Sequence, residues 1–214
     1  MSPRAAHLVA IIGALAGLAG LALQFAVLFR NLSSQGDEPL AIVWRFIGYF
    51  TILTNMLITA ILAGAALRPN QRQGLNAPVV EAIGVAGILL VGGAYHALLA
   101  DRWDPQGAQL AADIMLHSVM PLLFGLFWLL RPHGDLGWRD ALICMVWPLG
   151  YCAYALVRGA FDGFYAYWFL DPLNSSLGEM IRNIAGLSTA FLVGALGLVA
   201  IDKALARTLR PAAP

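Results

Sequence analysis

Three polar side chains lie within the otherwise apolar segment YFTILTNMLI, residues 49–58. They are Thr51, Thr54 and Asn55, and spacings of three and four residues put them on one face of a helix. A threonine hydroxyl becomes a nucleophile when a neighbouring base takes its proton. An asparagine amide or a second hydroxyl can donate a hydrogen bond to a developing oxyanion. The segment therefore contains groups that suit acyl transfer.

A second polar pair, Asp113 and His117, lies four residues apart on another predicted helix. A carboxylate one turn before an imidazole can orient the ring and stabilise its charged form. Ionisable pairs inside a membrane bundle generally mark functional sites. We therefore expect His117 to act as a general base whose orientation is fixed by Asp113, with no metal and no cofactor required.

The elements that carry these residues are long apolar segments. The chain has 214 residues, of which 60% are hydrophobic and 12% charged, whereas about 25% charged residues is typical of a soluble domain. The sequence predicts an all-α fold, a polytopic integral membrane bundle that forms a single domain over residues 1–214. Its six predicted transmembrane helices, each long enough to cross roughly 30 Å of hydrocarbon, lie at about 8–30, 41–67, 79–100, 109–130, 140–158 and 180–202. The first apolar segment exceeds the length of a signal-peptide core, so we expect it to be retained.

Basic residues are distributed unequally between the two sides of this predicted bundle. One side has Arg30, Arg45, Arg102, Arg158 and Arg182. The side that carries both termini has more of them, namely Arg4, Arg68, Arg72, Arg131, Arg139, Lys203, Arg207 and Arg210. Cytoplasmic loops carry an excess of lysine and arginine, so we expect both termini to be cytoplasmic.

The polar residues around Thr51 and the pair Asp113 and His117 are predicted to lie at similar depth in the membrane. Counted along unbroken helices that enter from the outer side, Thr51 is about 15 Å deep and His117 about 12 Å deep. His96, Arg158 and Asn183 are predicted near the outer ends of three other helices. Unsatisfied polar groups are costly in hydrocarbon, so we expect them to face one another or a wet cavity.

The long outer loop GAFDGFYAYWFLDPLNSSLG, residues 159–178, is rich in aromatic side chains. Such rings favour the membrane interface, and we expect the loop to cap the polar cluster. Its candidates for contact with a substrate are Tyr165, Tyr167 and Asp171.

Structural roles remain open for each of these residues. A threonine in a membrane helix commonly bonds the carbonyl one turn back, and Asn55 can join two helices. His96 can lie at the interface beside Tyr95, and Arg158 can extend to the membrane surface or pair with an outer acid.

Three segments carry a family resemblance: FTILTNML, YHALLADRWDPQGAQLAADIMLHSVMPLLF (95–124) and LVRGAFDGFYAYWFLD (156–171). In this order they resemble the bacterial six-helix membrane proteins often labelled Pr-six-Pr. That group is similar to the eukaryotic androgen-induced membrane proteins, which are threonine hydrolases that cleave fatty acid esters of hydroxy fatty acids. The resemblance implies that Thr51 and His117 are the essential threonine and histidine, and that the protein lies in a bacterial inner membrane.

The sequence thus predicts an intramembrane lipid-ester hydrolase whose partners are membrane lipids, not nucleic acid. A non-enzymatic small transporter or structural bundle is the alternative. A third possibility is a cofactor-binding protein in which His96 and His117 bind haem, or in which the aromatic side chains line a quinone pocket.

Overall fold

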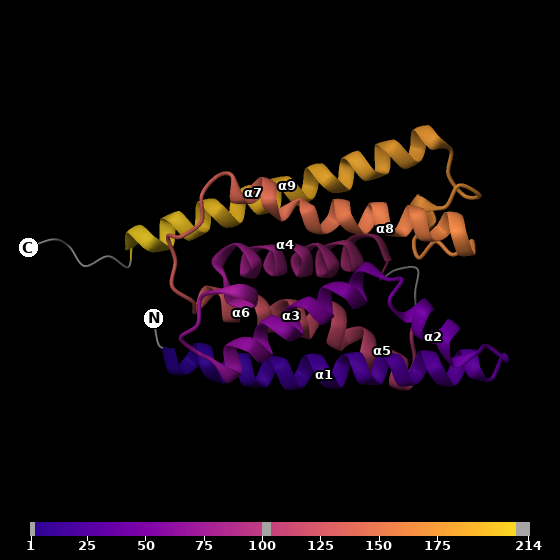
Figure 1. Ribbon diagram of the computed structural model, residues 1–214, viewed down its shortest axis with the longest axis horizontal. Coiled ribbons are helices and arrows are strands. Elements are labelled where there is room, and N and C mark those ends of the chain that lie inside the picture. The colour runs from indigo at the N-terminus through magenta and orange to yellow at the C-terminus, as the bar shows by residue number, and fades with distance from the viewer. Residues whose placement is uncertain (1–2, 100–103, 209–214) are drawn as a thin grey trace, which may run out of the picture.

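The computed structural model describes residues 3–99 and 104–208, and within these ranges the chain forms helices and no strand (Figure 1). In the part of the chain that the structure describes, six helical segments are long and apolar enough to cross a membrane: Pro3–Ser33, Phe50–Leu67, Pro78–Ala97, Gly107–Leu129, Asp140–Asp162 and Leu177–Thr208. The predicted all-α, six-helix bundle is confirmed. The predicted end of the third span at residue 100 lies outside the described residues, as do Arg102 and Arg210.

The helices follow one another in a simple order. The first half contains α1 (Pro3–Ser33), α2 (Pro39–Phe46), α3 (Phe50–Leu67) and α4 (Pro78–Ala94), and α4 continues into a π-helical turn at Tyr95–Leu99. After it come α5 (Gly107–Ile114), a π-helical turn at Met115–Val119, and α6 (Met120–Leu129). The chain ends with α7 (Asp140–Cys144), α8 (Val146–Asp162) and α9 (Leu177–Thr208), and short 3₁₀ turns occur at Gly74–Asn76 and Trp168–Leu170.

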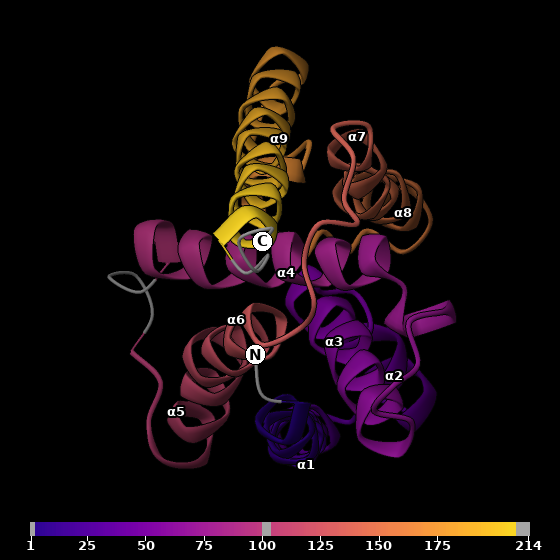
Figure 2. The same ribbon diagram turned by 90° about the vertical axis from the view of Figure 1, so that its left-hand side faces the viewer.

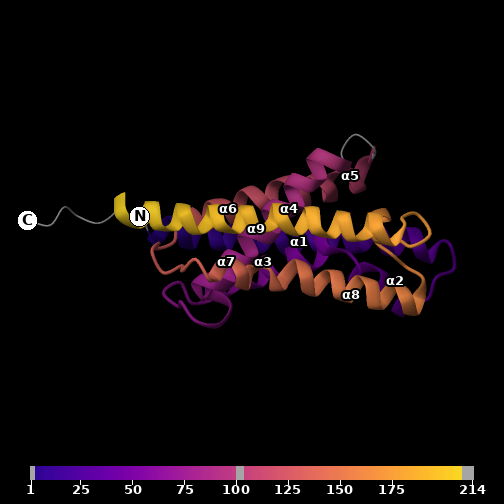
Figure 3. The same ribbon diagram turned by 90° about the horizontal axis from the view of Figure 1, so that it is seen from above.

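The helices form two groups with α4 between them. Figures 1 and 2 show α1, α3, α5 and α6 on one side of α4 and α7, α8 and α9 on the other, and α4 contacts members of both groups. Seen from above, α1, α8 and α9 run along the long axis of the molecule (Figure 3), whereas α4 crosses it obliquely (Figure 2). The start of α1 and the end of α9 lie at the same end of the bundle, as an even number of crossings requires.

Glycines let α4 pack closely against α6 and the turn that precedes it. A side chain at Gly84 would meet the Phe124 ring at 2.8 Å, and one at Gly92 would meet the His117 backbone oxygen at 3.1 Å. Gly84 and Gly92 are therefore close-packing positions between helices. Gly92 in particular brings α4 against the turn that carries His117.

The predicted helix at 41–67 is not continuous, which corrects the sequence analysis. It breaks at residues 47–49, between α2 and α3. The carbonyl oxygens of Ile47 and Gly48 accept hydrogen bonds from the hydroxyls of Tyr154, at 3.3 Å, and Tyr151, at 2.9 Å. The Arg158 guanidinium fills the space that a side chain at residue 48 would need. Contacts from α8 thus replace the helical hydrogen bonds that the break removes.

Candidate active site

The break places Thr51 in the first turn of α3, where its side chain faces His117. Oγ1 of Thr51 lies 3.4 Å from Nε2 of His117. Both side chains are half-buried. Direct approach of these two residues, expected from their similar depth, is confirmed. The distance is longer than that of a strong hydrogen bond, and catalytic hydrogen bonds are commonly long before substrate binds.

The second nitrogen of the His117 ring is held by Asp113. Nδ1 lies 3.2 Å from the Oδ1 atom of the Asp113 carboxylate and 3.1 Å from the Asp113 backbone oxygen. Both partners are acceptors, so we infer that Nδ1 carries the ring proton. The lone pair on Nε2 then points to the Thr51 hydroxyl, which is the arrangement that a general base needs. The predicted contact between Asp113 and His117 is confirmed.

Tyr95 is a member of the site that the sequence analysis considered only as a neighbour of His96. Its ring stacks on the His117 ring, with centroids 4.1 Å apart and planes inclined by 17°. Its hydroxyl interacts with the Asp113 carboxyl group. Tyr95 and His117 each lie in a π-helical turn, a feature frequently found at functional sites. No local sequence signal distinguishes these turns from ordinary helix.

Thr51 and His117 line a largely apolar cavity of about 150 Å³. Its walls come from α3, α4, α8, α9 and the outer loop, and include Leu90, Val91, Pro148, Leu170 and Leu187. Apolar walls with a few converging polar groups are typical of a small-molecule site. The threonine and histidine therefore border a space that suits an apolar ligand.

Tyr167 of the outer loop closes the cavity beside Thr51. Burial raises the pKa of its phenol, and hydrogen bonding to the Thr51 side chain and to the backbone of Thr51 and Phe50 opposes that rise. The phenol thus lies over the first turn of α3, whose backbone N–H groups have no partner within the helix. The Tyr167 phenol oxygen accepts from these groups, so the backbone N–H donors of Phe50 and Thr51 lie beside the Thr51 hydroxyl.

The other two polar residues of α3 join helices. The Asn55 amide nitrogen donates to the backbone oxygens of Thr51, at 2.9 Å, and Leu116, at 3.3 Å, which ties α3 to the turn that carries His117. Thr54 is fully buried and accepts a hydrogen bond from the indole nitrogen of Trp147 at 3.0 Å. Thr51 and Asn55 therefore face the histidine turn, whereas Thr54 faces α8, and neither Thr54 nor Asn55 lines the cavity.

The remaining candidates lie outside the cavity lining. His96 is exposed, and its Nε2 lies 3.0 Å from the Ser118 hydroxyl. Arg158 pairs with Asp162 at 3.0 Å, so the alternative in which it pairs with an acid is confirmed. Asn183 is half-buried on α9.

Two residues of the outer loop have local contacts. Tyr165 packs against Gly159 of α8. Asp171 accepts hydrogen bonds from the Leu173 backbone, at 2.9 Å, and from the Asn174 side chain. These contacts shape the loop, and of its predicted candidates only Tyr167 lines the cavity.

Comparison of the chain with protein-family models, with curated proteins and with solved structures finds no match.

Proposed function

We propose that the protein is an intramembrane ester hydrolase in which Thr51 is the nucleophile, His117 the general base and Asp113 the group that orients the base. The observation that carries this proposal is the approach of Thr51 Oγ1 to His117 Nε2, at 3.4 Å, on the wall of an apolar cavity. The nucleophile, the base and the orienting carboxylate form the chain of contacts that defines a catalytic triad.

The reaction follows from these contacts. Nε2 of His117 takes the hydroxyl proton while Oγ1 of Thr51 attacks the ester carbonyl carbon. The tetrahedral intermediate collapses, the alcohol leaves with the proton from His117, and an acyl-threonine ester remains. Water, deprotonated by His117, then attacks this ester, which releases the fatty acid and restores the threonine.

Donors for the oxyanion come from the first turn of α3. The backbone N–H groups of this turn and the phenol of Tyr167 lie beside Thr51. Donors that are fixed before the reaction begins stabilise the developing charge, and loss of one such donor commonly lowers the rate by about 10²- to 10³-fold.

The apolar walls favour an acyl chain as the substrate group. A fatty acyl ester of a lipid, such as a fatty acid ester of a hydroxy fatty acid, can place its chain against Leu90, Val91 and Leu187 and its carbonyl beside Thr51. We also propose that the protein lies in a bacterial inner membrane with both termini in the cytoplasm, in agreement with its arginine and lysine distribution. The site then lies toward the outer leaflet, beneath the outer loop.

Covalent labelling tests the proposal. Purified protein in detergent is treated with a long-chain alkyl fluorophosphonate, the labelled peptide is identified by mass spectrometry, and hydrolysis of a long-chain ester is measured in parallel. We expect the label on Thr51. Thr51→Val and His117→Ala should each abolish labelling and hydrolysis, and the double variant should be little worse because members of one catalytic unit are non-additive.

Thr189→Val is the matched control, since the Thr189 hydroxyl donates along its own helix, to the Ala185 oxygen at 2.8 Å. Thermal unfolding identifies variants that lose activity because they no longer fold. A folded Thr51→Val protein with unchanged labelling and hydrolysis would exclude the hydrolase and leave a transporter or structural bundle.

A further inference from the structure

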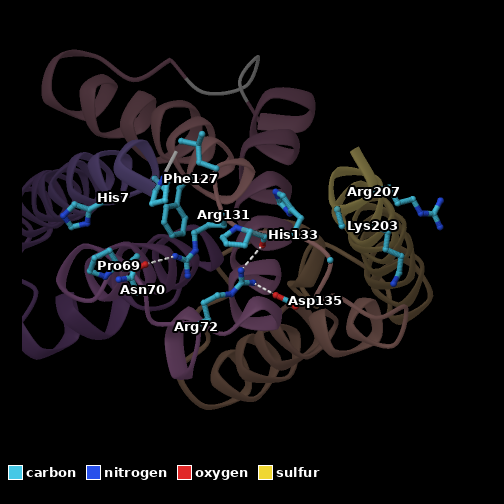
Figure 4. Close-up of a pocket in the computed structure, with 17 residues that line it drawn as sticks. His7, Pro69, Asn70, Arg72, Phe127, Arg131, His133, Asp135, Lys203 and Arg207 are labelled. Atoms are coloured by element: carbon cyan, nitrogen blue, oxygen red, sulfur yellow. Dashed lines mark hydrogen bonds and ion pairs between the residues drawn. The ribbon is translucent and has the colours of Figure 1, made fainter. Parts of the chain in front are cut away.

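A second, larger cavity lies at the end of the bundle where α1 begins and α9 ends (Figures 1 and 4). Its volume is about 770 Å³, which falls in the range of small-molecule sites. It is lined by the start of α1, the ends of α3, α6 and α9, and the loop at residues 130–135. None of its lining residues belongs to the cavity beside Thr51.

Positive charge dominates the lining of this cavity. Arg72, Arg131, Lys203 and Arg207 line it together with one carboxylate, that of Asp135. Figure 4 shows Arg72 and Arg131 near its centre, with Lys203 and Arg207 to one side on α9. So much charge of one sign around a cavity attracts an anion.

The two central arginines are fixed in place. Arg131 pairs with the buried Glu81 at 2.8 Å and donates to the backbone oxygens of Pro69 and Gln71. Arg72 pairs with Asp135 at 2.7 Å and donates to the Pro132 oxygen. Because Glu81 and Asp135 balance the charges of these two arginines, the arginines shape the cavity but add little net charge to it.

The cations on α9 have no such balance. Within the described ranges, no carboxylate lies within salt-bridge distance of Lys203 or Arg207. They are one helical turn apart on the same face, and their flexible stems can reach a bound group. The imidazole of His7 lines the cavity as well, and its Nδ1 atom is shielded from solvent without a hydrogen-bond partner in the part of the chain that the structure describes. The Lys203 ammonium also lies 5.9 Å from the centre of the Trp138 ring, a cation–π contact that uses none of its hydrogen-bond donors. Lys203, Arg207 and His7 therefore keep hydrogen-bonding groups for a ligand.

We propose that this cavity binds a phosphate-bearing anion through Lys203, Arg207 and His7. Phosphate supplies the negative charge and the acceptors that these groups lack. Ala6, Ala65 and Phe127 add apolar surface to the same lining, so the headgroup of an anionic phospholipid fits it well. Basic pockets between membrane helices bind such headgroups. The site is separate from the proposed hydrolase centre and does not depend on that function.

Thermal unfolding of the detergent-purified protein tests the site. Mixed micelles that contain phosphatidylglycerol should raise the unfolding temperature in a saturable manner, and micelles that contain phosphatidylcholine should not. The Lys203→Gln/Arg207→Gln variant should need at least tenfold more phosphatidylglycerol for the same shift. Arg207 is exposed and has no ion pair with the described residues. Arg207→Gln alone should therefore weaken phosphatidylglycerol binding in the same direction but by less.

The Arg30→Gln/Arg182→Gln variant is the charge-matched control, because both residues are exposed and lie at the far ends of α1 and α9. It should bind as the wild type does. Titration with inorganic phosphate, compared with sodium chloride of equal ionic strength, distinguishes a lipid headgroup from free phosphate. If phosphate alone gives a saturable rise in unfolding temperature that the Lys203→Gln/Arg207→Gln variant loses, and phosphatidylglycerol adds nothing to it, the ligand is free phosphate. Equal loss in both double variants, or no anion-dependent shift in the wild type, would overturn the proposal.

Discussion

Thr51 and His117 are 66 residues apart in the chain, and their Oγ1 and Nε2 atoms lie 3.4 Å from each other. Two irregular backbone features allow this contact. The break at residues 47–49 puts Thr51 in the first turn of α3, and a π-helical turn at Met115–Val119 carries His117. Asn55 joins the two segments through the backbone oxygens of Thr51 and Leu116. The pair is thus positioned by backbone contacts as well as by side-chain packing.

Asp113→Asn tests the orientation of His117. The amide keeps the size of the carboxylate but removes its negative charge, so the imidazolium that forms when His117 takes the Thr51 proton loses its stabilising partner, while the Asp113 backbone oxygen remains beside Nδ1. We expect labelling of Thr51 and ester hydrolysis to fall by about 10²- to 10⁴-fold while the protein remains folded. The measurement is the rate of fluorophosphonate labelling. Unchanged labelling in a folded Asp113→Asn protein would remove Asp113 from the mechanism.

Gly92→Ala tests the contact between α4 and the histidine turn. The added methyl group would lie 3.1 Å from the His117 backbone oxygen and 3.2 Å from Pro121, and overpacking of this kind costs about 1–3 kcal/mol. We expect a lower unfolding temperature and slower labelling, because the turn that carries His117 must shift by a few tenths of an ångström.

Gly93→Ala is the matched control for this change. Gly93 is exposed, and a methyl group there meets nothing within 4 Å. Its replacement should leave labelling intact and strengthen the helix by up to about 1 kcal/mol. Equal effects at both positions would contradict the close-packing role of Gly92.

Gly48→Ala tests the break between α2 and α3. A methyl group at residue 48 takes the place of the Arg158 guanidinium, which is held by Asp162 at 3.0 Å and lies over the Trp44 ring at 4.4 Å. We expect a loss of about 1–3 kcal/mol in stability together with reduced labelling. The measurements are thermal unfolding in detergent and the labelling rate. Gly150→Ala, at an exposed position of α8 with nothing within 4 Å, should show neither effect.

Asp202→Ala tests how the loop after α6 is attached to α9. The buried Asp202 carboxylate lies 3.0 Å from Nδ1 of His133 and accepts from the backbone N–H groups of Gly134, at 3.0 Å, and Leu136, at 3.1 Å. Removal leaves these donors unpaired, so we expect a loss of about 3 kcal/mol.

Asp140→Ala is the comparison for this prediction, since the half-buried Asp140 accepts from one backbone group, the Gly137 N–H at 2.7 Å. That change should cost about 1 kcal/mol. Denaturation in detergent ranks the two variants. Equal losses would show that burial and the additional donors at Asp202 contribute nothing to the attachment.

The sequence by itself determined the six membrane-spanning segments and the contact between Asp113 and His117. A span is a property of local composition, because about twenty apolar residues in a helix match the thickness of the hydrocarbon core and satisfy their own backbone groups. A contact over four residues is likewise fixed by helix geometry alone.

Only the tertiary structure decided where the second span breaks and which polar residues share the cavity. The break depends on Tyr151, whose hydroxyl reaches the Gly48 oxygen from 103 residues later in the chain. The predicted common face of Thr51, Thr54 and Asn55 divides between the histidine turn and Trp147 of α8, since one helix face is wide enough to contact two neighbours. Tyr95 joins the site by stacking on His117. Such contacts depend on how separate helices pack, and helical periodicity carries no information about the identity of the neighbour.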